Sequence, residues 1–116
     1  MTRGAFTSNY ERWVLGRRRG KTVQAELSRT YRDAWRNGDE HDRYLALNFI
    51  FETRDSSGFE LVIDGLHSHE AGLAQHAAIM ASVLVGKGAL QLTPAVRRAF
   101  AKYNRRFPER SFPEHG

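Results

Sequence analysis

The sequence contains no cysteine, only three prolines, and only three lysines among its 18 basic residues. Without cysteine the chain has no disulfide, no thiolate ligand for zinc and no cysteine nucleophile. Its longest apolar stretch, residues 71–85, is interrupted by Gln75 and His76 and is too short and too polar for a membrane span. The first fifteen residues also lack the apolar run of a signal peptide. We therefore expect a cytoplasmic protein without a membrane partner.

The composition is that of an ordinary folded protein, with 41% hydrophobic and 27% charged residues in 116. This length predicts a single domain, and we expect loose tails over about 1–8 and 108–116. Fifteen of the basic residues are arginine. The guanidinium group suits phosphates and carboxylates, but a GC-rich genome is the more ordinary source of an arginine excess.

The charges are divided along the chain into three blocks. Residues 1–38 contain nine Lys/Arg and three Asp/Glu, a net charge of +6, whereas residues 39–86 contain two and eight, a net charge of −6. Residues 87–116 return to seven and two, a net charge of +5. Two basic segments therefore flank an acidic one, and only the basic segments suit a polyanion.

Apolar periodicity predicts three main helices, at about 21–37, 69–85 and 94–107. Thr93-Pro94 is a typical start for the last of them. The alanines of the second would let another backbone approach closely. A shorter helix is expected to run from the Ser8–Glu11 capping-box pair to Leu15, before a basic loop that two glycines bound.

Residues 43–64 are predicted to form a β-hairpin, which makes the expected fold class α+β. Leucine and phenylalanine alternate with other residues over 45–51, and Phe59, Leu61 and Ile63 do so over 59–63. Residues 55–58 read Asp-Ser-Ser-Gly, a turn cluster. A rival interpretation continues a helix from Asp39 through Glu52. A lone hairpin must pack on a helix, and an exposed edge strand would let a second copy pair to form a homodimer.

The candidate nucleic-acid-binding residues are basic side chains in a loop and on two helix faces. A row of arginines at three- and four-residue spacing can follow a phosphate backbone, and Tyr10 and Trp13 could stack on unpaired bases. The alternative is a solvated surface, or pairing of these cations with the acidic segment. The set comprises Arg17, Arg18, Arg19, Lys21, Arg29, Arg32, Arg36, Arg98, Lys102 and Arg105, with Arg97 and Arg106 beside the last three.

The histidines give no clear catalytic or metal site. His41, His67, His69 and His76 lie in the acidic segment, and His69 and His76 would share a helix face. Their spacing is not the His-Glu-x-x-His of zinc proteases, and no Ser–His–Asp arrangement is apparent. We therefore predict a protein that is not an enzyme and has no cofactor or metal.

Three functions remain open, and the third is a metal-dependent enzyme that uses His67, His69 and His76. The first is a small binding protein that contacts DNA, RNA or a nucleoprotein complex through its arginine-rich faces. The second is an inhibitor or adaptor, of the kind that a phage or mobile element encodes, that binds a host protein complex. In that case the acidic segment could imitate nucleic acid toward a basic groove. The acidic residues proposed for this imitation are six of the eight in the segment: Asp39, Glu40, Asp42, Asp55, Glu60 and Asp64.

Overall fold

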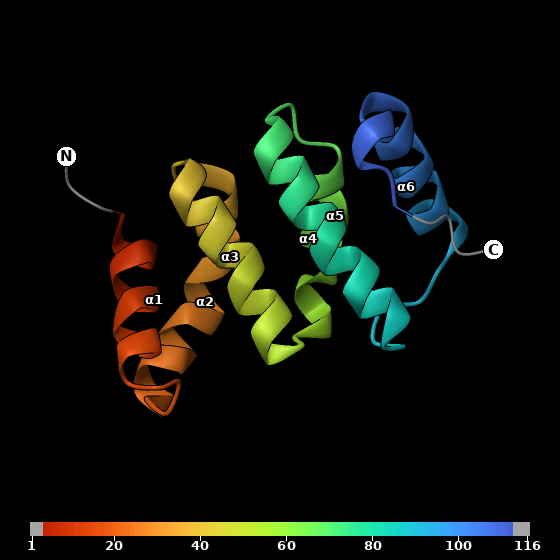
Figure 1. Cartoon of the computed structure of the whole chain (residues 1–116). Helices are drawn as coiled ribbons and strands as arrows, with labels where there is room; N and C mark the ends of the chain where they lie inside the picture. The colour runs from red at the N-terminus through yellow and green to blue at the C-terminus, as the bar shows by residue number, and fades with distance from the viewer. Residues whose placement is uncertain (1–3, 113–116) are drawn as a thin grey trace. The chain divides into compact units, whose positions relative to one another are not determined.

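A computed structural model describes residues 4–112 of the chain, and within this range it is entirely helical (Figure 1). The chain divides into two compact units, Met1–Thr53 and Arg54–Gly116. The single domain expected from the chain length stays a prediction. The elements in order are α1 (Ala5–Leu15), α2 (Lys21–Asn37), α3 (Glu40–Thr53), the 3₁₀ helix η1 (Ser56–Gly58), α4 (Phe59–Leu66), α5 (Ala71–Gly86), α6 (Pro94–Arg106) and the 3₁₀ helix η2 (Pro108–Arg110).

The N-terminal unit is a three-helix cluster around aromatic side chains. Trp13 of α1 packs edge-on against Tyr10 and Phe49, with ring centroids 5.7 and 5.2 Å apart. The ring of Tyr31 of α2 also packs against Phe49, with ring centroids 5.8 Å apart. All four rings are buried, so that each helix contributes at least one aromatic residue to the same core.

Asp42 joins the starts of α1 and α3. Its carboxylate accepts hydrogen bonds from the backbone and the hydroxyl of Thr7 and from the backbone of Asp39, and Asp39 in turn accepts one from the backbone of Asp42. A Cβ on Gly4 or Gly38 would lie under 3 Å from atoms of Asp42. The two glycines therefore let the chain close around a buried carboxylate that caps two helix N-termini.

The C-terminal unit packs α5 against α4, and α6 contacts both. Four alanines of α5 are fully buried, as the predicted small-residue face requires, and they are Ala74, Ala77, Ala78 and Ala81. From α6, Phe100 and Tyr103 reach the core. Beyond α6 the chain folds back, because the side chain of Asn104 exchanges hydrogen bonds of 2.8 and 2.9 Å with the backbone of Phe112.

The predicted β-hairpin over 43–64, and with it the α+β fold class, is wrong. Residues 40–53 form α3, residues 59–66 form α4, and no strand occurs in residues 4–112. A strand over 45–51 would have placed Ala46 and Ile50 on the face opposite to Leu47 and Phe49. All four residues are instead buried together, which is the pattern of a helix. The rival helix from Asp39 is the correct interpretation, and its reciprocal Asp39–Asp42 caps explain why it begins there.

Residues 55–58, the predicted hairpin turn, have a different role in the structure. Asp55 does not close a hairpin; its side chain accepts from the backbone and hydroxyl of Ser57 and caps η1, which leads into α4. The edge strand on which the expected homodimer depended does not exist in the described part of the chain.

The predicted helices over 21–37, 69–85 and 94–107 correspond to α2, α5 and α6, with ends that differ by at most two residues. The N-terminal tail is shorter than predicted, because α1 begins at Ala5 and Phe6 and Thr7 are buried. Residues 108–112 of the predicted C-terminal tail are not loose, because they include η2 and the hydrogen bonds between Asn104 and Phe112. Residues 1–3 and 113–116 of the two predicted tails lie outside the described part. Among the helices described, none is long and apolar enough to cross a membrane.

Candidate nucleic-acid interface

Helix α6 is oriented by its cap and by its apolar face. The hydroxyl of Thr93 accepts a hydrogen bond of 3.3 Å from the backbone of Val96, and Pro94 occupies the first turn. Val96, Phe100 and Tyr103 are buried. Because a helix turns by about 100° per residue, burial of these positions leaves another face of α6 directed toward solvent.

That outer face borders a groove between α4 and α6, with a volume of about 490 Å³. We call it the α4/α6 groove. Arg98, Lys102 and Arg105 line it at spacings of four and three residues, so that they follow one side of the helix. Its other lining residues are Ile63, His67, Ala95, Ala99 and Ala101. The groove thus combines three cations with an apolar floor and has no carboxylate among its lining residues.

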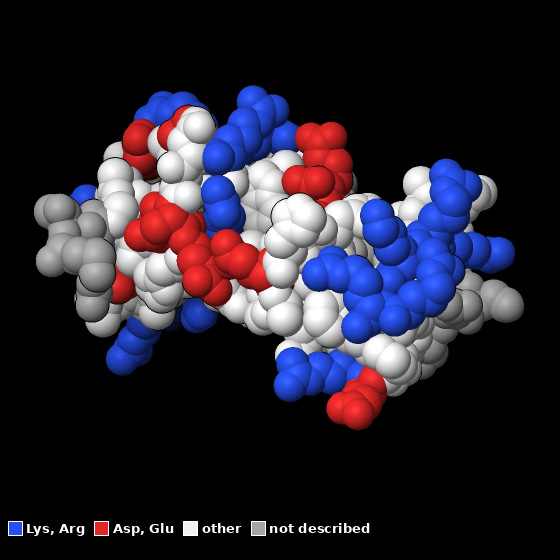
Figure 2. All heavy atoms as spheres, turned by 90° about the horizontal axis from the view of Figure 1, so that it is seen from above, with Lys and Arg blue, Asp and Glu red and all other residues white. Residues whose placement is uncertain are grey.

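The three cations of this groove are exposed and not engaged within the unit. Between Gly4 and Phe112, no hydrogen bond or ion pair involves the side chain of Arg98, Lys102 or Arg105. Figure 2 shows the wider result, a continuous gathering of Lys and Arg side chains over α6.

Three further arginines belong to the same end of the C-terminal unit. Arg97 is exposed. The guanidinium carbon of Arg106 lies 4.8 Å from the ring centre of Phe107. Arg110 donates a hydrogen bond of 3.0 Å to the amide oxygen of Gln75. None of these contacts neutralises a cation. The positive charge of this surface therefore remains available to an external anion.

The basic loop of the N-terminal unit is arranged differently. The guanidinium of Arg18 forms an ion pair with Glu52 of α3, partly through a hydrogen bond of 3.2 Å from Nη2 to Oε1. Arg17 and Arg19 are exposed. Arg17 and Arg18 both have left-handed backbone conformations, with φ of 55° and 61°. The predicted loop cluster is therefore divided between one cation bound to a carboxylate and two directed toward solvent.

The predicted arginine row on α2 is also divided. Arg29 forms an ion pair with Glu26 one turn earlier, and Arg32 is half-buried with its guanidinium carbon 5.3 Å from the Tyr31 ring centre. Lys21 and Arg36 are exposed. Part of this row is consequently neutralised by its own helix, whereas the pairing with the acidic segment that the sequence left open occurs between Arg18 and Glu52.

Tyr10 and Trp13 cannot serve as an external stacking platform, because they are only 6% and 3% exposed. Tyr10 instead donates a hydrogen bond of 3.0 Å to the Glu52 carboxylate. Burial, and secondly the charge of Glu52, raise the pKa of Tyr10 to about 12. The predicted role in base stacking is therefore wrong, and both rings belong to the core.

The four histidines occupy different places. His41 is exposed on α3, His67 caps the end of α4, and His69 precedes α5, so that the predicted helix face shared by His69 and His76 does not exist. Burial lowers the pKa of His76. No group of three His, Asp or Glu side chains in residues 4–112 could hold a metal ion. His67 is the histidine placed beside the cations, in the α4/α6 groove.

The predicted acidic surface is reduced and divided. Asp42 is buried as a helix cap, whereas Asp39 and Glu40 are exposed and line a hollow together with His41 and Tyr44. The other acidic residues, Asp55, Glu60 and Asp64, belong to the C-terminal unit. The sequence predicted a hairpin for this segment. The prediction therefore missed that Ile63 and His67, at the end of α4, border α6.

No protein-family model, no curated protein and no solved structure matches this chain. Of the surfaces described, the α4/α6 groove alone combines a hollow, three neighbouring cations and the absence of an acidic lining residue within residues 4–112. The groove therefore has the positive charge that an anionic ligand requires.

Proposed function

We propose that this chain is a non-enzymatic cytoplasmic protein that binds nucleic acid, or a complex containing it, through phosphate contacts at the α4/α6 groove. One observation carries the proposal. Arg98, Lys102 and Arg105 line one groove without a neutralising partner in the described part of the chain. The three side chains can accordingly replace the counterions of a phosphate backbone.

The spacing of these cations supports a linear polyanion as the ligand. Seven residues of helix separate Arg98 from Arg105, a rise of about 10 Å. One DNA strand presents a phosphate about every 3.4 Å of helix axis, so about three phosphates fall within this length. Arginine adds a planar fork that bonds two phosphate oxygens at once. The imidazole of His67 borders the same groove and can donate a hydrogen bond to a phosphate oxygen.

The test is fluorescence anisotropy of labelled duplex DNA, single-stranded DNA and RNA, between about 50 and 200 mM salt. The main variant carries Arg98→Glu, Lys102→Glu and Arg105→Glu. A matched control makes the same change of charge at exposed residues of the N-terminal unit: Arg19→Glu, Lys21→Glu and Arg36→Glu. Urea unfolding of both variants checks that they fold.

We expect the α6 variant to lose at least about 100-fold in affinity and about 2.7 in the slope of log K against log salt. The control variant should lose less than about fivefold, through net charge alone. Equal losses in the two variants would remove the groove from the proposal. A wild-type protein that binds none of the three probes at low salt would remove nucleic acid altogether.

A second candidate function is an adaptor that binds a protein, and the hollow at the start of α3 favours it. Asp39 and Glu40 are exposed there beside Tyr44, a combination that suits a basic protein surface. This function predicts one stoichiometric partner that co-purifies after nuclease treatment and is lost with Asp39→Lys and Glu40→Lys. Retention of that partner by the double variant would exclude the hollow as its site.

A further inference from the structure

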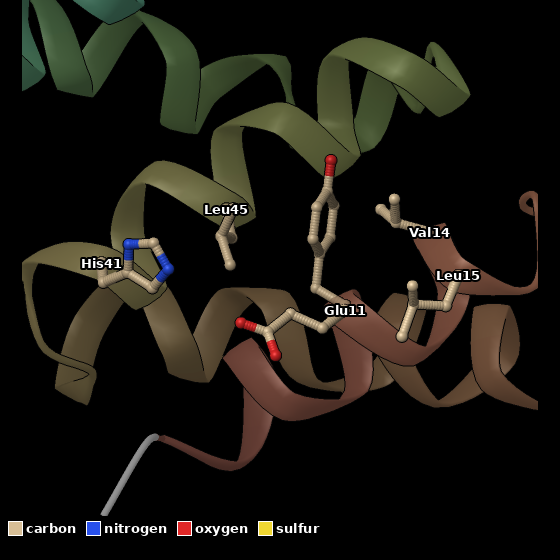
Figure 3. Close-up of a pocket in the computed structure, with 6 residues that line it drawn as sticks. Glu11, Val14, Leu15, His41 and Leu45 are labelled. Atoms are coloured by element: carbon tan, nitrogen blue, oxygen red, sulfur yellow. The ribbon is translucent and has the colours of Figure 1, made fainter. Parts of the chain in front are cut away.

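The N-terminal unit has an apolar hollow between α1 and α3, with a volume of about 360 Å³ (Figure 3). We call it the α1/α3 hollow. Its lining residues are Tyr10, Glu11, Val14, Leu15, His41 and Leu45. Leu15 is 82% exposed, which is more than any other large hydrophobic side chain of the described residues. An exposed leucine therefore lies at the edge of a hollow that Val14 and Leu45 make apolar.

The two ends of this hollow carry opposite charges. Helices α1 and α3 run in the same direction, because Thr7 contacts Asp42 near their starts and Arg18 contacts Glu52 near the end of α3. Glu40 lies at the start of α3, and Figure 3 shows the Glu11 carboxylate directed to the His41 side of the hollow. The basic loop, with Arg17 and Arg19 exposed, follows the end of α1.

We propose that this face is the interface of a homodimer, in which a second copy packs antiparallel and each Leu15 enters the α1/α3 hollow of the other copy. A two-fold interface needs a surface that complements itself. Here the exposed Leu15 and the hollow lie on the same face, and the acidic and basic side chains lie at opposite ends of that face. An antiparallel arrangement brings Arg17 of each copy toward Glu11 of the other, and it also pairs the helix dipoles favourably.

Self-complementarity distinguishes a second copy from a foreign partner. A foreign helix would need only the hollow and one sign of charge, and it would not need an exposed leucine on this side. The chain offers both halves of the contact on one face within α1, α3 and the loop that follows α1. Burial of Leu15 and of the walls of the hollow would supply the apolar part of the association free energy.

The mass of the full chain, measured by sedimentation equilibrium after nuclease treatment, tests the proposal. We expect twice 13.3 kDa at high protein concentration. Leu15→Glu should raise the dissociation constant at least about tenfold, because it places a charge in the apolar contact. Ile79→Glu is the matched control and should leave the mass unchanged, since Ile79 of α5 is the other exposed large hydrophobic residue within residues 4–112, at 46%.

A charge exchange tests the antiparallel orientation. Arg17→Glu and Glu11→Arg should each weaken the dimer, whereas the double variant should restore at least part of the affinity. Circular dichroism confirms that each variant is folded. A wild-type chain that is monomeric at every concentration would overturn the proposal, and so would equal dissociation by Leu15→Glu and Ile79→Glu. Additive weakening in the double variant would overturn the antiparallel arrangement.

Discussion

The two units carry nearly the same net charge but distribute it in opposite ways. Residues 1–53 contain ten Lys/Arg and seven Asp/Glu, a net charge of +3; residues 54–116 contain eight and six, a net charge of +2. In the N-terminal unit, carboxylates cap helices and bind Arg18 and Arg29. In the C-terminal unit, six of the eight cations lie between residues 97 and 110, where Glu109 is the only acidic residue.

This difference shows that net charge does not decide whether a cation is available to a ligand. What decides it is the distance to the nearest carboxylate in the folded chain, since a paired guanidinium must lose its partner before it can bind a phosphate. Figure 2 makes the contrast visible, because acidic and basic side chains are interspersed over the N-terminal unit and the basic ones gather over α6. Charges of the first unit should therefore matter for stability, and those of α6 for binding.

The largest expected effect on stability comes from Asp42→Ala. This change leaves the backbone groups of Thr7 and Asp39 without the carboxylate that accepts their hydrogen bonds. We expect the free energy of unfolding to fall by about 3 kcal/mol, the sum of two lost caps and a buried polar gap. Urea unfolding measures it. Glu40→Ala, an exposed change in the same turn, should cost less than about 0.5 kcal/mol; a similar loss from both variants would contradict the role of Asp42.

A smaller effect is expected from Glu52→Gln, which removes the charge that Arg18 and Tyr10 share. Stability should fall by about 1 kcal/mol. The pKa of Tyr10 should decrease from about 12 but stay above 10, because burial is the larger cause of its increase. Absorbance titration at alkaline pH measures it, with Tyr10→Phe to assign the signal. A pKa that does not move would show that the Tyr10–Glu52 contact is absent in solution.

The same residue gives the wild-type protein a dependence on alkaline pH. Tyr10 has a pKa of about 12 in the folded chain and about 10 when unfolded. Between these values the unfolded chain binds fewer protons than the folded one, so the free energy of unfolding decreases as the pH rises from 10 to 12. Below pH 10 this contribution is fully present. The decrease should be smaller in Tyr10→Phe.

The smallest expected effect is a gain. Arg17 has φ of 55°, a left-handed conformation that costs a residue with a Cβ about 1 kcal/mol or more. At a protein concentration at which the chain is monomeric, Arg17→Gly should therefore raise the free energy of unfolding by about 0.5 kcal/mol, after the added flexibility of the unfolded chain is subtracted. Arg19→Gly removes the same charge, but Arg19 does not have a left-handed backbone conformation, so this change should not raise the free energy of unfolding. Thermal unfolding of the two variants decides between strain and charge.

The sequence predicted the helices whose periodicity was complete and missed those whose pattern allowed two interpretations. In α2 and α6, the buried and charged residues lie on opposite faces, and the expected ranges agree with the structure. In α3, apolar residues occupy both odd and even positions, so that period 2 and period 3.6 fit equally well until burial is known. The return segment 59–64 failed for the same reason, as Leu61 and Val62 are consecutive and both buried.

The candidate site was only partly predictable for a related reason. The row formed by Arg98, Lys102 and Arg105 follows from helical spacing alone, and the structure keeps it on one face. The contribution of His67 to the same groove could not follow from spacing, because it depends on how α4 packs against α6. Likewise, only a folded chain shows that Asp42 is a buried cap rather than part of an acidic surface.

The sequence by itself determined the positions of α2, α5 and α6, the alternation of basic and acidic segments, and the exclusion of all cysteine chemistry. These properties depend on residue type and on local periodicity, which are written directly in the order of residues. Tertiary structure alone decided that residues 43–64 are helical, that Glu52 neutralises Arg18, and that the α6 cations have no such partner in the described chain. The physical reason is that pairing and burial depend on distances between segments far apart in sequence, and folding sets those distances.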